Sequence, residues 1–212
     1  MGETALTVAV LAFFGFRLAS GAQFAASTEG RRRVGEVARG IRWRHIWPVP
    51  IVWMVVLAVA LALLQVPGLS WGWWSALGGQ GNPIIGGTDR ASGTVFEWLV
   101  PLVFLTLLVP ALPLFAMREE EIFRRGAQNW SKWKRLGKAT LFGSVHAVVG
   151  IPIAVALALT IGGLYFTHAY LRAWRATQSE REALLESARA HTAYNACIVV
   201  LAYVVVVLTA FS

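Results

Sequence analysis

The sequence predicts an all-α protein, a polytopic bundle of transmembrane helices. Hydrophobic residues make up 57% of the chain and charged residues only 14%, with a mean hydropathy of +0.59. Several apolar runs reach the length of about 20 residues that a helix needs to cross a bilayer. The basic residues gather in the loops between those runs. A soluble domain of this length does not need so many hydrophobic and so few charged residues.

The apolar runs predict about six membrane segments. Four runs qualify by length alone: 4–26, 46–66, 95–117 and 191–211. The stretch 138–171 is too long for one upright span and too short for two full ones. Pro152, shortly after Gly150, predicts a break near residue 150. We therefore expect a shorter helix before the break and a span over 151–171 after it.

The charge pattern predicts how the chain is oriented. The sequence has 19 Lys and Arg against 11 Asp and Glu, a net charge of +8. Three loops hold most of the basic residues: 27–45, 118–138 and 172–190. The loop 67–94 holds only Arg90. Basic loops stay cytoplasmic, so both termini are expected outside; a single span over 138–171 would put the last basic loop outside. Charge placed in this way indicates membrane topology, and no nucleic-acid partner is expected.

The chain divides into two parts that we expect to form one structural unit. Residues 1–94 hold two transmembrane helices, a basic cytoplasmic loop and a glycine-rich outer loop around 78–87. Residues 95–212 hold the remaining helices and the polar clusters. His45 lies in a basic loop and is expected to be exposed. The charged segment 176–190 is expected to form a solvated helix that leads into the last span.

Three polar clusters interrupt the apolar second part of the chain. They lie at 120–126, 142–146 and 191–195, and in each of them key residues are four positions apart. That spacing places both side chains on one face of a helix. Ionisable side chains in or beside membrane helices are costly, so they indicate a functional site. Each cluster taken alone also fits a structural role, as an interfacial patch, a packed histidine or a polar helix start.

The first cluster supplies paired carboxylates. Glu120 and Glu121 face directions about 100° apart on a helix. Each has an arginine four residues later, Arg124 and Arg125 respectively. One pair can be structural while the other carboxylate faces the bundle interior. A carboxylate shielded from water suits a general base.

The other two clusters supply partners for that base. His146, on a different helix, can share a water with the carboxylate, while His191 and Asn195 can donate hydrogen bonds to an oxyanion. Peptide hydrolysis needs these parts and no serine or cysteine nucleophile. Glu120, His146 and His191 are also a plausible zinc set, although the sequence has no His-Glu-x-x-His motif. We rank the metal interpretation second.

The three clusters, in this order, resemble the CPBP family of CAAX-protease and bacteriocin-processing membrane proteins, also called the abortive-infection family. The family pattern is Glu-Glu-x-x-x-Arg, then Phe-x-x-x-His, then His-x-x-x-Asn or Asp. This chain matches it with Glu120, Glu121, Arg125, Phe142, His146, His191 and Asn195. A second register, from Glu119 to Arg124, also satisfies the first motif. We prefer the later one because Arg125-Gly126 matches the usual Arg-Gly of the family. The resemblance covers 95–211.

The resemblance implies an intramembrane endopeptidase of the glutamate type. Under it, Glu120 and His146 activate water, His191 and Asn195 stabilise the oxyanion, and Glu121, Arg125 and Phe142 support the site. The implied substrate is a membrane-associated protein or peptide, cut near the cytoplasmic face of a bacterial inner or plasma membrane. No cofactor is expected, with zinc as the alternative. The competing hypothesis is a non-catalytic scaffold, accessory or immunity protein that keeps the fold. The oligomeric state stays open.

Overall fold

The computed structural model describes residues 2–73 and 93–210, and within these ranges the secondary structure is helical, without strands. The predicted all-α class is confirmed. The glycine-rich loop at 78–87 lies outside the described residues. The α-helices are α1 (Gly2–Ala26), α2 (Thr28–Ala38), α3 (Trp43–Ile46), α4 (Val49–Leu64), α6 (Phe96–Arg124), α7 (Lys132–Val145), α8 (Ile153–Ala158), α9 (Thr160–Thr177) and α10 (Glu180–Ala210). Two short 3₁₀ helices follow α6 and α7, at Ala127–Asn129 and His146–Val149.

Four helical segments among the described residues are long and apolar enough to cross a membrane. They are Trp43–Leu64, Glu97–Asn129, Ile153–Thr177 and Glu180–Leu208. They contain most of the spans predicted at 46–66, 95–117, 151–171 and 191–211. The span predicted at 4–26 forms the continuous helix α1, which is not one of the four. The part of the chain that the structure describes is therefore all-α, with four candidate spans.

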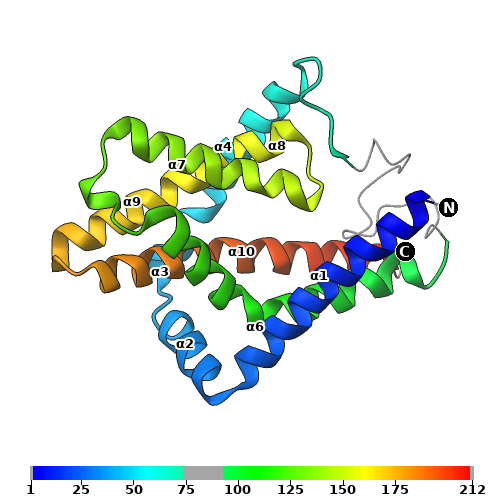
Figure 1. Cartoon of the computed structure of the whole chain (residues 1–212), viewed down its shortest axis with the longest axis horizontal. Coiled ribbons are helices and arrows are strands. Elements are labelled where there is room, and N and C mark those ends of the chain that lie inside the picture. Colours follow the sequence, from blue (N-terminus) through cyan, green and yellow to red (C-terminus); the bar gives the residue numbers. More distant parts are fainter. Residues whose placement is uncertain (1, 74–92, 211–212) are drawn as a thin grey trace.

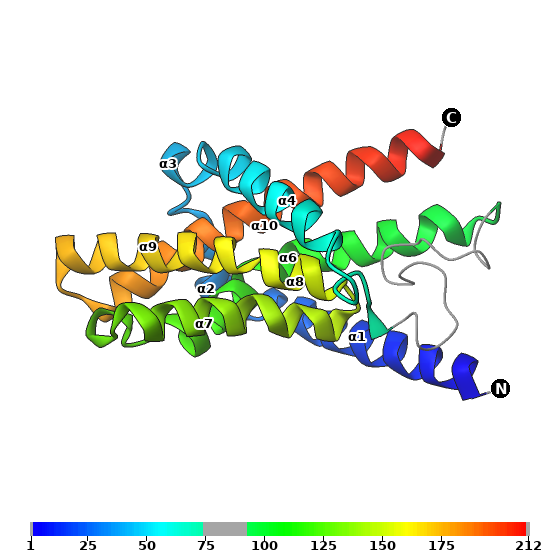
Figure 2. The same ribbon diagram turned by 90° about the horizontal axis from the view of Figure 1, so that it is seen from above.

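The two ends of the described chain lie at the same end of the molecule, far from the basic segments. Figures 1 and 2 place the start of α1 and the end of α10 at one end of the molecule, and α2 with the α9–α10 turn toward the other. The turn between α6 and α7 lies toward that second end as well. All three basic segments thus share one end, which is the arrangement that the charge pattern predicts.

Helix α10 lies at the centre of the bundle and packs mainly against α6 and α9. Helix α1 packs along α6, and α7 packs along α9 (Figure 1). The first turns of α10 are buried from Ala183 to Ala188. The prediction of a solvated helix over 176–190 is therefore wrong for these turns, because α10 already enters the bundle there. The polar residues of these turns face other helices and need partners on them.

Small residues let α7 approach α8 and α9 very closely. A Cβ added to Gly143 would lie 2.4 Å from the carbonyl oxygen of Ala156 and 2.8 Å from the nitrogen of Thr160. A Cβ added to Gly163 would lie 3.0 Å from the carbonyl oxygen of Ala139. The backbones therefore touch without intervening side chains. This contact fixes the neighbouring Phe142 against the centre of the bundle.

The predicted break near residue 150 is confirmed. Helix α7 ends at Val145, a 3₁₀ turn covers His146–Val149, and α8 begins at Ile153. Gly150 has a φ of 91°, a conformation that residues with a Cβ rarely adopt. Phe142 consequently lies within α7, whereas His146 lies at its end.

Candidate functional site

Glu120 lies at the centre of a buried polar cluster formed by α6 and α10. Its side chain is 0% exposed. Nη1 of Arg124, one turn further along α6, lies 3.2 Å from its Oε1. Nδ1 of His191 on α10 lies 2.9 Å from the same oxygen. Ser187 donates a hydrogen bond to its other oxygen. A buried carboxylate needs such partners, and here two hydrogen-bond donors and one cation converge on it.

Aromatic rings enclose this cluster. The guanidinium carbon of Arg124 lies 4.2 Å from the centre of the Phe142 ring, in reach of a cation–π interaction. The ring of His191 stacks on Phe166 at 4.2 Å with an interplanar angle of 19°. Arg124 also donates a hydrogen bond to the carbonyl of Gly163 on α9. The rings hold both side chains in one orientation and shield the ion pair from water.

Glu119 is the less constrained carboxylate of the site. Its side chain is 33% exposed, and its Oε2 lies 3.7 Å from Nε2 of His191. That oxygen is itself buried and has no hydrogen-bond partner among the described residues. His191 therefore lies between two carboxylates, with Nδ1 toward Glu120 and Nε2 toward Glu119. An ionised carboxylate only accepts, so Nδ1 carries the proton in the contact with Glu120.

The structure separates the two possible registers of the first motif. Glu121 and Arg125 pair at 3.5 Å with side chains 31% and 57% exposed, on another face of α6. The residues of the earlier register lie in the buried cluster: Glu119 and Glu120 lie beside His191, and Arg124 lies beside Glu120. Of the residues expected for catalysis or support in this motif, only Glu120 lies in the buried cluster.

The second and third motifs lie beside the cluster. His146 is half-buried, and its Nδ1 lies 2.8 Å from the carbonyl oxygen of Phe142. The Phe142 ring lies 5.0 Å from the His146 ring and 5.4 Å from the His191 ring, centre to centre. His146 therefore contacts the aromatic wall, and no hydrogen bond within the described ranges joins it to Glu120. Asn195 is half-buried one turn after His191, without a side-chain hydrogen bond in the described part of the chain.

Ser187 is the member of the cluster that the sequence reasoning missed. It lies four residues before His191, so it shares a face of α10 with His191 and Asn195. The same spacing that selected the third motif extends backward to this serine. Phe166 had no comparable signal, because an aromatic residue in an apolar span is usual.

A second buried carboxylate lies next to Ser187 in the sequence. Glu186 is 5% exposed, and its oxygens lie 3.0 Å from Arg44, 3.1 Å from Arg172 and 3.1 Å from Nε2 of His45. His45 is 1% exposed, so the prediction that it is solvent-exposed is wrong. Its Nδ1 accepts a hydrogen bond from the backbone of Arg42. The cluster joins α3, α9 and α10.

Of the three residues proposed as zinc ligands, Glu120 and His191 are in contact, whereas His146 makes no hydrogen bond or ion pair with either of them among the described residues. No group of three His, Cys, Asp or Glu side chains in the ranges 2–73 and 93–210 is placed to hold a metal ion. His146 contacts the ring and the carbonyl of Phe142, and Glu120 is already bound by the Arg124 cation.

No family model matches the chain, no curated protein matches it, and no solved structure matches it. The resemblance in the three motifs therefore depends on their residues alone.

Proposed function

We propose that the chain is an intramembrane endopeptidase of the glutamate type, which hydrolyses a peptide bond in a membrane-associated protein or peptide. The observation that carries the proposal is the row Glu119–His191–Glu120. It combines a partly exposed carboxylate, whose buried oxygen lacks a partner among the described residues, with a histidine whose other nitrogen is held by a buried carboxylate. Such an arrangement is typical of acid–base sites.

Glu119, in place of Glu120, is the general base of this proposal. Both oxygens of Glu120 are occupied: Oε2 accepts a hydrogen bond from Ser187, and Oε1 contacts Nδ1 of His191 and lies 3.2 Å from Nη1 of Arg124. Oε2 of Glu119 accepts no hydrogen bond from the described residues, and the side chain is 33% exposed. Glu120 then has the role of a positioning residue that fixes the ring of His191.

The proposed reaction uses one water. Glu119 takes a proton from the water as its oxygen attacks the scissile carbonyl carbon. The N–H group at Nε2 of His191 donates a hydrogen bond to the oxyanion of the tetrahedral intermediate. Glu119 then gives its proton to the departing amine as the C–N bond breaks. Asn195 and His146 flank the substrate in this proposal, and no metal takes part.

The proposed topology has six membrane segments with both termini outside. It is supported by the four candidate spans and by the three basic segments at one end of the molecule. Glu119 and Glu120 lie in the last turns of α6, near that basic end. The proposed site therefore faces the cytoplasmic side of a bacterial inner or plasma membrane.

A non-catalytic scaffold is the second candidate, and one observation favours it. The pair Glu120–Arg124 is fully buried and close, as in an ion pair whose role is structural. Under this hypothesis Glu119 has no chemical task.

The test is a comparative map of protein N-termini in host membranes. Cells carry the wild type, Glu119→Gln or Glu182→Gln at matched expression levels; Glu182 is a carboxylate of α10 paired with exposed Arg181. We expect new N-termini with the wild type and with Glu182→Gln. Glu119→Gln should lower their abundance about 100-fold or more, the usual effect of losing a general base.

One result contradicts the assigned base, and a second contradicts the peptidase itself. Undiminished N-termini with Glu119→Gln would rule out Glu119 as the base. Identical maps with and without the protein, together with a host phenotype that Glu119→Gln still restores, would favour the scaffold.

A further inference from the structure

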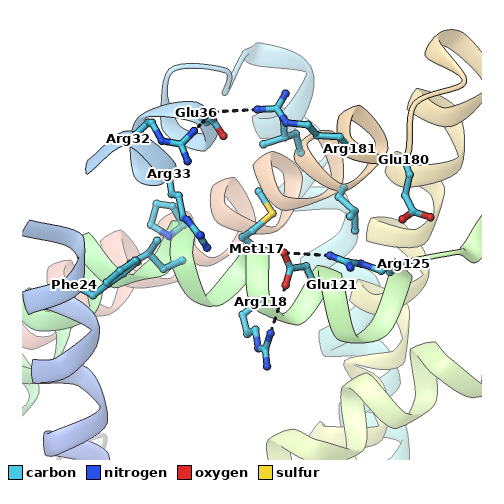
Figure 3. A pocket seen from close by; sticks show the side chains of 14 residues that line it. Phe24, Arg32, Arg33, Glu36, Met117, Arg118, Glu121, Arg125, Glu180 and Arg181 are labelled. Atoms are coloured by element: carbon cyan, nitrogen blue, oxygen red, sulfur yellow. Dashed lines mark hydrogen bonds and ion pairs between the residues drawn. The ribbon is translucent and has the colours of Figure 1, made fainter. Parts of the chain in front are cut away.

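A cavity of about 530 Å³ opens on a different face of α6 from the one that holds Glu120. Figure 3 shows it between the end of α1, helix α2, helix α6 and the start of α10. Phe24, near the end of α1, and Met117 of α6 lie on its wall. The cavity is therefore situated where an apolar helix ends and a basic segment begins.

Charged side chains surround one part of this cavity. Five arginines and three glutamates line it: Arg32, Arg33, Arg118, Arg125, Arg181, Glu36, Glu121 and Glu180. The arginines of α2 and α10 are held by close ion pairs at 2.7 to 3.2 Å with Glu29, Glu36 and Glu182. Arg32 and Arg33 keep the pKa of Glu29 at about 2, so Glu29 is charged at neutral pH. These pairs leave little charge for a ligand.

The two arginines of α6 are the exception. Arg118 and Arg125 share a single carboxylate, Glu121, at 3.5 Å each. Their side chains are 74% and 57% exposed. A guanidinium has five N–H donors, so most of the donors of this pair stay open. Figure 3 shows Glu121 between the two guanidinium groups.

The rest of the wall is apolar. It is formed by Phe24 of α1, Pro113, Leu114 and Met117 of α6, and Leu184 and Leu185 of α10. A soluble anion gains nothing from such a wall, whereas an amphiphile with an anionic head gains from both parts. Basic pockets between transmembrane helices, at the end where the basic segments lie, suit the head groups of anionic lipids.

We propose that this cavity binds an anionic phospholipid of the surrounding bilayer. Its phosphate contacts Arg118 and Arg125, and its glycerol and first acyl carbons lie against Leu114, Met117 and Phe24. The proposal is independent of the peptidase, because the cavity and the Glu119–His191 pair lie on different faces of α6.

The test measures lipid retention by the full-length protein in detergent. Phosphatidylglycerol or phosphatidylcholine with the same acyl chains is added at one ratio, and bound lipid is counted by native mass spectrometry. We expect the wild type to retain phosphatidylglycerol about tenfold better than phosphatidylcholine. Arg118→Gln/Arg125→Gln should lower that retention about tenfold, and Glu121→Gln should raise it, since it frees both guanidinium groups.

The control removes the same charge from the same end of the molecule. Arg31 and Lys132 are exposed and do not line the cavity, so Arg31→Gln/Lys132→Gln should change retention less than about twofold. Thermal unfolding midpoints verify that all variants fold. Inorganic phosphate, in large excess over the lipid, should fail to displace it.

Three results overturn the proposal. Equal retention of the two lipids removes the requirement for an anionic head. Equal losses in the two double variants indicate a general charge effect. Displacement by inorganic phosphate identifies a phosphate site that does not need a lipid.

Discussion

Two buried carboxylates, Glu120 and Glu186, have similar partners but different surroundings. Each contacts at least one arginine and one buried histidine. Arg124, the partner of Glu120, is 1% exposed, whereas Arg44 and Arg172, the partners of Glu186, are 48% and 51% exposed. One cluster is closed to water, and the other is linked to the surface.

The histidines of the two clusters also differ. Nε2 of His45 lies 3.1 Å from Glu186 in an ion pair, and Nδ1 of His45 accepts a hydrogen bond from the backbone of Arg42. Nδ1 of His191 contacts Glu120, and its Nε2 lies 3.7 Å from an oxygen of Glu119 that has no hydrogen bond within the described ranges. Both clusters combine glutamate, arginine and histidine; what differs is the second carboxylate beside His191, since Glu119 is 33% exposed and lies 3.7 Å from Nε2.

The largest effect should come from Arg124→Met. It leaves the fully buried Glu120 without its cation, so the free energy of unfolding should fall by about 3–5 kcal/mol. Arg44→Met is the matched change in the other cluster. Glu186 keeps Arg172 and His45, so the loss should be about 1 kcal/mol or less. Unfolding titrations with denaturing detergent in mixed micelles measure both. Equal losses would remove the distinction between the clusters.

Ser187→Ala should have an intermediate effect. It deletes a hydrogen bond to a buried carboxylate, which is worth about 1.5–3 kcal/mol. Ser144→Ala, at a half-buried serine of α7, is the control and should stay within about 0.5 kcal/mol. The same titration applies. A loss at Ser187 no larger than at Ser144 would mean that Glu120 is already satisfied by Arg124 and His191.

Glu121→Gln should have the smallest effect, within about 0.5 kcal/mol of the wild type. Glu121 and Arg125 have the same spacing as Glu120 and Arg124, but they lie partly exposed. Detergent titration of Glu121→Gln beside Arg124→Met therefore compares two ion pairs of one helix. A loss for Glu121→Gln as large as that for Arg124→Met would show that exposure does not decide how much an ion pair of α6 contributes to the free energy of unfolding.

The sequence predicted features that depend on local spacing. The break at Gly150 and Pro152 and the shared face of His191 and Asn195 follow from backbone geometry. The register of the first motif did not follow, because three consecutive glutamates point to three directions on α6. Only the packing of α6 against α10 decides which of them is buried.

The sequence also did not predict which residues far apart in the chain would pair. His45 lies in a basic loop, which suggested exposure, but its partner Glu186 comes from the far end of the chain. Nothing in the local composition joins the two. Arg124 shows the same difficulty, because its place over the Phe142 ring depends on the approach of α7 to α6.

The close contact of α7 with α8 and α9 also limits how the molecule can move. The backbones meet at Gly143 and Gly163 with no space for sliding. The helices of the α7–α9 unit therefore resist sliding past one another, and Gly150 lies inside this unit, at the bend between α7 and α8. Phe142 belongs to the unit, whereas Glu120 and His191 belong to α6 and α10. A larger residue at Gly143 or Gly163 should therefore displace the aromatic wall over Arg124 without changing any residue of the buried ion pair.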